Sequence, residues 1–173
     1  MAGSDSTLLR DVLVADLRLV ICGAALGTVS AQKKLYYAGP GNRLWAILAE
    51  VGLTPRQLAP AEYLKLLEFG IGLTDIIKDQ SGADRSLSFG ETATAVLENK
   101  ILRYHPKLLC FNGKRAASAF LAIRPVSYGL QSQRVGNTRL YVAPSTSGAA
   151  RRWWDASHWT TMAALVMASA AEW

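Results

Sequence analysis

Residues 18–45 read RLVICGAALGTVSAQKKLYYAGPGNRLW, and this stretch decides the fold. It begins with RLVICG, an apolar run of strand length that ends at Gly23. The next residues, GAALG, form a small-residue turn that lets the backbone approach a ligand closely. A basic, aromatic loop then leads to GPGN at 39–42, a helix-start signal, and apolar residues follow at helical spacing. The predicted order is strand, tight turn, loop and helix.

The rest of the chain repeats this alternation. Strand-like apolar runs occupy 18–23, 70–74, 107–112 and 139–143, and helical patterns occupy 42–52, 60–69, 90–104, 114–121 and part of 155–171. We therefore expect an α/β fold, a three-layer α/β/α sandwich around a central, mainly parallel, four-stranded doubly wound sheet. The Gly136-Asn137 pair between QSQRV and TRLYV predicts a hairpin that leads into the final strand.

Length and composition favour one soluble domain. The 173 residues are 50% hydrophobic, enough for a full core in a single domain over 1–173. The opening MAGSDSTLLRDVL contains acids and lacks the apolar core of a secretory signal. The late apolar stretch 162–171 is too short to cross a bilayer. We expect a monomer in a bacterial cytoplasm, with no membrane partner.

Cysteine and histidine usage predicts neither a cofactor nor a metal. Cys22 and Cys110 each lie in a strand-like apolar run, which favours buried free thiols. Two cysteines cannot supply the four thiolates of an iron–sulfur cluster. His105 and His158 are isolated and lack metal-ligand spacing.

The charge balance favours a polyanionic partner. Lysine and arginine number 19 against 13 acids, a formal charge of +6. Three basic pairs, Lys33-Lys34, Lys114-Arg115 and Arg151-Arg152, lie in loops that follow predicted strands. Ligands of doubly wound sheets bind beyond the carboxyl ends of the strands, where GAALG, GLTD, NGKR and PSTSG converge. The pairs would then share one rim, although ordinary solvated loop charges are the alternative.

The opening block resembles the mismatch-specific uracil-DNA glycosylase and thymine-DNA glycosylase family of the uracil-DNA glycosylase superfamily. That family has a G-[IL]-N-P-G turn, a loop aromatic and a P-x-N-R-[FL]-W helix start. Here the counterparts are GAALG, Tyr37 and PGNRLW. The resemblance continues through GLTPRQL at 52–58, GLTD at 72–75 and Gly113-Lys114, and it ends in PSTSG at 144–148, where the family usually has P-N-P-S-G. It covers most of residues 18–165.

The resemblance implies a monofunctional uracil-DNA glycosylase of base-excision repair. Such an enzyme flips deoxyuridine out of DNA, hydrolyses the N-glycosidic bond and releases free uracil and an abasic site. Its partner would be uracil-containing DNA, single-stranded or mismatched. No lysine stands out as a Schiff-base nucleophile, so lyase activity is not predicted. The alternatives are a non-catalytic module that binds uracil or damaged DNA, and a glycosylase for another deaminated base.

Position 25 is where the chain departs from the family. Family members hold the attacking water with an asparagine here, whereas the methyl group of Ala25 forms no hydrogen bond. Backbone N–H groups near Ala24 and Ala25 can still bind the uracil anion. The resemblance also assigns base stacking to Tyr37 rather than Tyr36. With Gly23 and Asn42 added, the predicted substrate-binding residues are Gly23, Ala24, Ala25, Tyr37, Asn42 and Asp75.

Asp75 and Ser145 are the catalytic candidates. Asp75 follows G-L-T, a position that often reads the base in related enzymes, and it could place water or stabilise the sugar cation. A protonated Asp75 could instead donate to the base if burial raises its pKa. The alternative is a helix N-cap for the segment that begins at Ile76. Ser145 takes the position of a polar residue that contacts base or water in relatives, although STSG could be a simple turn.

The remaining candidates would contact DNA. Ser147 and Gly148 fit a phosphate, and the full DNA-binding set is Ser30, Lys33, Lys34, Lys114, Ser147, Gly148, Ala149, Arg151 and Arg152. Relatives often carry a bulky apolar wedge where this chain has Ala149, so we expect a preference for single-stranded or weakly paired uracil. Trp153, Trp154 or Arg151 could act as the wedge, although the tryptophans could instead seal the last helix against the sheet.

Overall fold

A computed structural model describes residues 7–82 and 89–170 of the chain. Its centre is a sheet in the order β2-β1-β3-β5-β4. The first four are parallel to one another: β2 (Ile71–Asp75), β1 (Leu19–Gly23), β3 (Leu108–Asn112) and β5 (Thr138–Ala143). The chain crosses from β1 out to β2 and then back to β3, which is the doubly wound arrangement predicted from the alternating pattern.

The sheet has five strands rather than the four expected. The fifth, β4 (Gly129–Val135), pairs antiparallel with β5 at the edge of the sheet. The predicted hairpin at Gly136-Asn137 joins the two, and Gly136 has a φ of +56° there. Side chains of β4 alternate between exposed and half-buried, and its polar residues therefore gave no apolar run to identify a strand.

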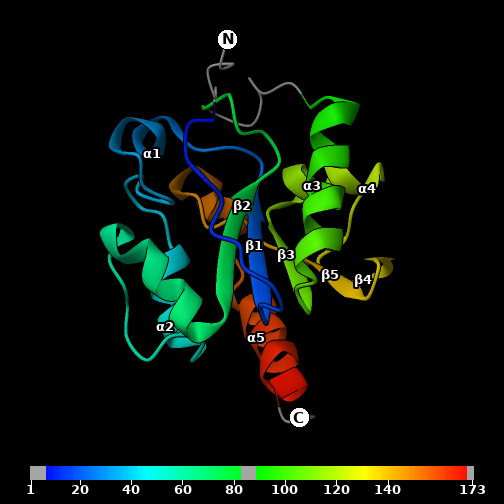
Figure 1. The fold of residues 1–173 in the computed structure, drawn as a ribbon. Helices are drawn as coiled ribbons and strands as arrows, with labels where there is room; N and C mark the ends of the chain where they lie inside the picture. Colours follow the sequence, from blue (N-terminus) through cyan, green and yellow to red (C-terminus); the bar gives the residue numbers. More distant parts are fainter. Residues whose placement is uncertain (1–6, 83–88, 171–173) are drawn as a thin grey trace.

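Alternate side chains of the parallel strands enter two separate cores, which makes three layers. Leu19 and Ile21 of β1 pack on one face with α2 (Leu44–Glu50) and α5 (Ala156–Ala170). Val20 and Cys22 pack on the other face with α3 (Glu91–Tyr104) and α4 (Lys114–Leu121). Figure 1 shows these two helical layers on opposite sides of the sheet. Cys22 and Cys110 are both buried free thiols.

Most predicted helices are present, with two additions. The short α1 (Thr28–Lys33) lies in the segment expected to be a loop, and a 3-10 helix, η3 (Gly148–Trp153), follows the PSTSG turn. The predicted helix over 60–69 is the 3-10 helix η1 (Pro60–Phe69). None of the helices in the described ranges is long and apolar enough to cross a bilayer.

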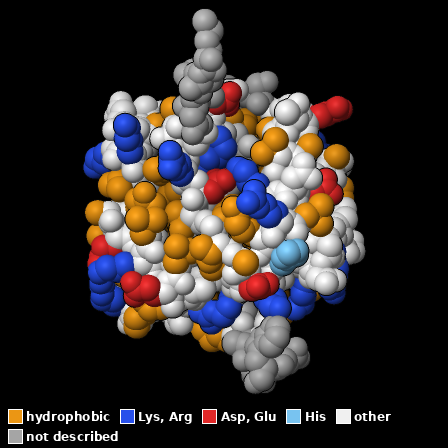
Figure 2. Space-filling model, in the orientation of Figure 1, with side chains coloured by type: hydrophobic (Ala, Val, Ile, Leu, Met, Phe, Trp, Pro, Cys, Tyr) orange, Lys and Arg blue, Asp and Glu red, His pale blue; other side chains and the backbone are white. Residues whose placement is uncertain are grey.

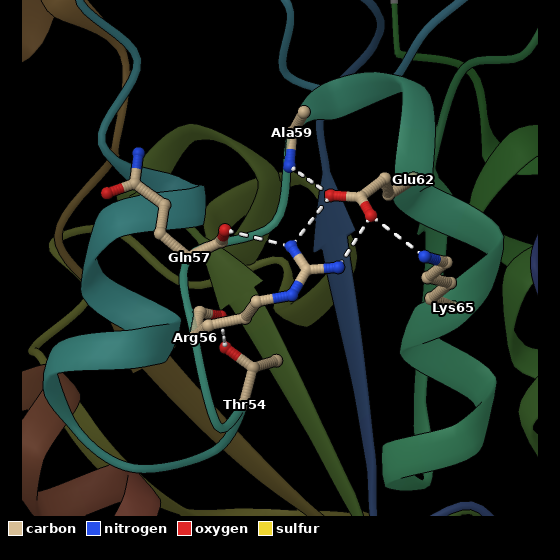
Figure 3. A network of polar contacts seen from close by, with 6 residues as sticks. All are labelled: Thr54, Arg56, Gln57, Ala59, Glu62 and Lys65. Atoms are coloured by element: carbon tan, nitrogen blue, oxygen red, sulfur yellow. Dashed lines mark hydrogen bonds and ion pairs between the residues drawn. The ribbon is translucent and has the colours of Figure 1, made fainter.

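A polar cluster fixes the start of η1 at the surface (Figure 3). Glu62 accepts a hydrogen bond of 3.0 Å from the backbone N–H of Ala59, and both terminal nitrogens of Arg56 reach its carboxylate at 2.6 and 2.9 Å. Lys65 adds a third contact at 2.9 Å. The Arg56 guanidinium, the Ala59 N–H and Lys65 hold the pKa of Glu62 below its usual range. The cluster keeps the GLTPRQL segment in a defined turn before the chain enters β2.

Candidate active site

A cleft of about 420 Å³ lies at the carboxyl ends of β1, β2, β3 and β5. All four predicted loops contribute to it, together with the helix-start segment at residues 39–42. The residues that line it are Gly23, Ala25, Leu26, Gly27, Ser30, Tyr36, Tyr37, Gly39, Pro40, Asn42, Asp75, Gly82, Asn112, Ser145, Thr146, Ser147, Gly148, Ala149, Ala150 and Trp153. The sequence elements singled out above therefore meet in one place.

Main-chain hydrogen bonds hold the GAALG turn. The carbonyl of Gly23 accepts from the N–H of Ile76 at 3.0 Å, and that of Ala24 accepts from Ile77 at 2.9 Å. Farther along, the Leu26 carbonyl accepts from Gly82 at 3.0 Å. Residues 76–82 thus run beside the turn and fix its backbone whatever its side chains are. Ala24 is buried, whereas Ala25 lines the cleft.

Asp75 is a buried carboxylate at the end of β2. It is only 3% exposed and stands in register with Gly23 of β1. Among the described residues its Oδ2 has no hydrogen-bond partner, and the nearest cation is the Nζ of Lys78 at 3.8 Å. Burial raises the pKa of Asp75 from 3.8 to about 6, against the attraction of Lys78. An aspartate of this kind can accept a proton near neutral pH.

The helix-capping alternative for Asp75 is excluded. No helix begins at Ile76, because the N–H groups of Ile76 and Ile77 pair with the carbonyls of the GAALG turn. The carboxylate consequently has no local backbone role of the kind that makes aspartate common after strands. A buried, underpartnered carboxylate in a cleft is a functional-site feature.

The two adjacent tyrosines have different surroundings. Tyr36 is fully buried, and its hydroxyl donates to the Arg10 carbonyl at 2.9 Å while accepting from Lys78 at 3.1 Å. Both tyrosines line the cleft, but Tyr37 is half-buried, and its hydroxyl has no hydrogen-bond partner among the described residues. It adopts a left-handed backbone with a φ of +50°, a conformation that costs energy for a tyrosine. Burial, followed by the charge of Asp75, raises the pKa of the Tyr37 phenol.

Asn112 is a lining residue that sequence reasoning did not select. Its amide forms a reciprocal pair with Thr146: the Thr146 N–H donates to Oδ1, and Nδ2 donates to the Thr146 hydroxyl, both at 2.9 Å. The sequence signal that could have identified Asn112 as a site residue is its place at the end of a strand, just before Gly113. The pair ties the end of β3 to the PSTSG turn that follows β5.

The PSTSG turn is ordered by its own hydroxyls. Ser145 Oγ accepts from the Ser147 N–H at 3.2 Å, and Ser147 Oγ accepts from the Ala149 N–H at 3.3 Å. A Cβ added at Gly148 would lie 2.8 Å from the Pro40 carbonyl, so glycine permits close contact between this turn and the 39–42 segment. Asn42 lines the cleft, and its Oδ1 accepts at 3.0 Å from the N–H of Leu44, the first residue of α2.

The predicted DNA-contacting cations lie around the cleft on separate elements. Lys33 ends α1, Lys114 begins α4, and Arg151 and Arg152 lie in η3. Figure 2 shows Lys and Arg side chains on the upper part of the face, the end where the parallel strands terminate in Figure 1, and others along its lower edge. Ser30 is buried instead, and its hydroxyl accepts from the Ala38 N–H at 2.9 Å, so DNA contact by that side chain stays a prediction.

Among the described residues, the three tryptophans after the PSTSG turn divide by exposure. Trp159 is fully buried and donates to the Pro144 carbonyl at 3.0 Å, while Trp154 stacks on it with ring centroids 6.5 Å apart. Both pack α5 against the sheet, which was the predicted alternative to a role as the DNA wedge. Trp153 is 66% exposed at the rim of the cleft, with the Arg152 guanidinium 5.6 Å from its ring centre.

Comparison with known proteins identifies the family. The model of the uracil DNA glycosylase superfamily matches residues 11–165. The chain belongs to this superfamily. Its fold is similar to the solution NMR structure of a proposed uracil DNA glycosylase from Methanosarcina acetivorans, with a TM-score of 0.61 and 24% identity over 92% of this chain and 96% of that one. The predicted superfamily is thus confirmed, and membership supports a glycosylase function.

Proposed function

We propose that this superfamily member is a monofunctional uracil-DNA glycosylase, most like the mismatch-specific enzymes, that uses Asp75 in place of the usual asparagine of the first turn. The observation that carries the proposal is the position of Asp75: a buried carboxylate whose Oδ2 has no hydrogen-bond partner among the described residues, in register with Gly23 at the floor of the cleft. Ala25 lines the same cleft, and its side chain supplies no polar group.

The proposed reaction divides the work among the lining residues. Tyr37 stacks on the flipped uracil, and backbone N–H groups near Ala24 and Ala25 stabilise the developing negative charge on the base. Ionised Asp75 accepts a proton from the water that attacks C1′ of the sugar. The C1′–N1 bond breaks, the electron pair leaves with uracil, and an abasic site remains. Ser145 is a second polar contact to water or base.

Repulsion between Asp75 and the departing uracil anion sets a geometric condition on this mechanism. The carboxylate must face the sugar, where positive charge develops, rather than the anionic edge of the base. Its place between Gly23 and Lys78 at the bottom of the cleft is compatible with that orientation. The reaction therefore requires the ionised form of Asp75.

DNA binding would use the rim of the cleft. All five predicted cations are exposed, and cations of this kind neutralise phosphates: Lys33, Lys34, Lys114, Arg151 and Arg152. Ala149 offers no wedge, which favours uracil in single-stranded or weakly paired DNA. We further propose that the protein acts as a monomer in a bacterial cytoplasm.

A second candidate is a non-catalytic uracil-binding module, which Ala25 favours because the family's water-holding group is absent from the first turn. Release of uracil from an end-labelled oligonucleotide with one deoxyuridine, measured under single-turnover conditions, separates the two. We expect cleavage by the natural chain and a loss of at least about 100-fold in Asp75→Ala, as for removal of a general base. Asp79→Ala, which removes an exposed carboxylate from the same loop, is the matched control. Tight binding without release would establish the binding module instead.

A further inference from the structure

A cluster of charged side chains lies next to Asp75, and its other charged members, Asp11, Lys78 and Lys100, are not among the residues that line the cleft. Its centre is Lys78, whose Nζ is 2.9 Å from Asp11 Oδ1, 3.1 Å from the Tyr36 hydroxyl and 3.8 Å from Asp75 Oδ2. Lys100 binds the other oxygen of Asp11 at 2.6 Å. The Lys78 side chain is only 16% exposed, so solvent screens these contacts weakly.

The fold brings this cluster together from four separate parts of the chain: Asp11, Tyr36, the segment from Asp75 to Lys78, and Lys100 of α3. Asp11 lies in the N-terminal segment, which runs antiparallel beside β2 at a bridge between Val12 and Leu73. Thr74 of β2 donates its hydroxyl to Asp11 Oδ1 at 2.7 Å, which fixes that carboxylate. The Lys78 carbonyl accepts from the Leu8 N–H at 2.9 Å, so the same segment also fixes the backbone of the lysine.

The position of Lys78 follows from these anchors rather than from Asp75. Two short contacts, to Asp11 and Tyr36, hold the ammonium group, and its distance to Asp75 is longer than a hydrogen bond. Lys78 is thereby held 3.8 Å from the Asp75 carboxylate. The Oδ2 atom of Asp75 has no hydrogen bond from the described residues. A positive charge placed in this way stabilises the ionised carboxylate without occupying the oxygen that would contact water.

Other charges and titratable groups act on the same carboxylate. Burial opposes ionisation of Asp75 most strongly, Lys78 and Lys100 favour it, and Asp11 opposes it. The groups that face Asp75 from the surrounding elements are Asp11, Cys22, Tyr36, Tyr37, Lys78 and Lys100. Lys78 is the nearest cation among the described residues, so its removal should change the charge state of Asp75 more than any other single substitution in the cluster.

We propose that Lys78 is the positioning residue of the site: fixed by Asp11 and Tyr36, it holds the Asp75 carboxylate ionised and oriented at the floor of the cleft. The proposal deepens the role assigned to Asp75 and rests on it for its consequence in catalysis. The electrostatic part stands by itself and can be measured in the protein without DNA.

The direct test is a carboxyl-carbon NMR titration of Asp75 in the natural chain, Lys78→Met and Lys78→Arg. In the natural chain we expect a midpoint near the pKa of about 6. Lys78→Met should raise the midpoint by about one unit or more, as expected for loss of a close opposite charge, and Lys78→Arg should restore most of it. Lys100→Met, which removes a contact to Asp11, should shift the midpoint less. An unchanged midpoint in folded Lys78→Met would overturn the proposal.

The second test is the pH dependence of single-turnover uracil release. Lys78→Met should move the acidic limb of the profile to higher pH by the same amount as the NMR midpoint, with the DNA affinity unchanged and the rate recovered at high pH. A uniform loss at every pH would indicate a merely structural role and would contradict the proposal. Absence of cleavage by the natural chain, with the NMR shift present, would remove the proposed function and leave the electrostatic role of Lys78 intact.

Discussion

Gly23 and Asp75 face each other across neighbouring parallel strands so closely that a single methyl group would not fit between them. A Cβ built on Gly23 lies 2.6 Å from Asp75 Oδ1 and 3.2 Å from the Tyr37 hydroxyl. Both distances are shorter than ordinary van der Waals contact. Asp75 can therefore keep its position at the end of β2 only because residue 23 is a glycine.

Gly23→Ala should displace Asp75 and abolish most activity while the sheet stays folded. We expect a fall of about 100-fold in single-turnover uracil release, because small displacements of a catalytic group have effects of this size. Gly27→Ala is the matched control: it lies in the same turn, lines the same cleft, and its added Cβ meets nothing within 4 Å. Equal activity of the two variants would show that the position of Asp75 does not matter.

Asp75→Asn should increase the free energy of unfolding at neutral pH. Burial raises the pKa of folded Asp75 from 3.8 to about 6, so the ionised group destabilises the native state. That shift corresponds to roughly 3 kcal/mol at most. The gain should vanish below about pH 4 and grow as the pH rises through about 6, because the carboxyl of the natural chain is protonated at the lower pH. Urea unfolding of the two proteins, measured below about pH 4 and at neutral pH, gives the difference in the free energy of unfolding. A destabilised Asp75→Asn at neutral pH would contradict this account.

Tyr37→Ala should weaken binding of uracil. Loss of one stacked base costs about 1–3 kcal/mol, which corresponds to about 5- to 150-fold in affinity. Tyr36→Phe is the comparison, because it removes only a hydroxyl in a fully buried ring that supports Lys78. Fluorescence titration with uracil or with a deoxyuridine oligonucleotide gives both affinities. Similar losses in the two variants would refute the assignment of Tyr37 as the stacking residue.

Trp153→Ala should reduce cleavage of duplex uracil more than cleavage of single-stranded uracil. An exposed aromatic at the rim can fill the space left by the flipped nucleotide and offset unstacking, which costs a few kcal/mol. We expect a fall of about tenfold on duplex, with stability changed by no more than about 0.5 kcal/mol because the side chain is 66% exposed. Leu64→Ala, which truncates a 60% exposed apolar side chain of η1, controls for surface effects. A parallel loss on both substrates would argue against a wedge.

The sequence was sufficient for the four parallel strands, the doubly wound class of the sheet and the convergence of four loops on one cleft. Apolar runs that end in Gly23, Asp75 and Asn112 mark strand ends, and the ends of parallel strands must meet on one edge. The edge strand β4 was missed because its outward polar side chains interrupt the apolar pattern. The helix α1 was missed because its six residues begin without a side-chain cap.

The parts of the site that escaped prediction depend on contacts between distant residues. Asn112 acquires its role only when Thr146 lies beside it, and neither residue by itself signals a pair. Asp11 contacts Lys78 because the N-terminal segment pairs antiparallel with β2, which no local pattern of charges could indicate. Local sequence predicted the elements and their ends, whereas the electrostatics of the cleft required the tertiary structure.

The hydrogen bonds that join residues 76–82 to the first turn use only main-chain atoms, from Gly23, Ala24 and Leu26 on one side. The conformation of this turn is therefore independent of the side chain at position 25. An asparagine introduced there, Ala25→Asn, would add an amide to a turn that already has its final shape. In this chain the shape of the binding site and the identity of its polar groups are separate properties, and the second can change without the first.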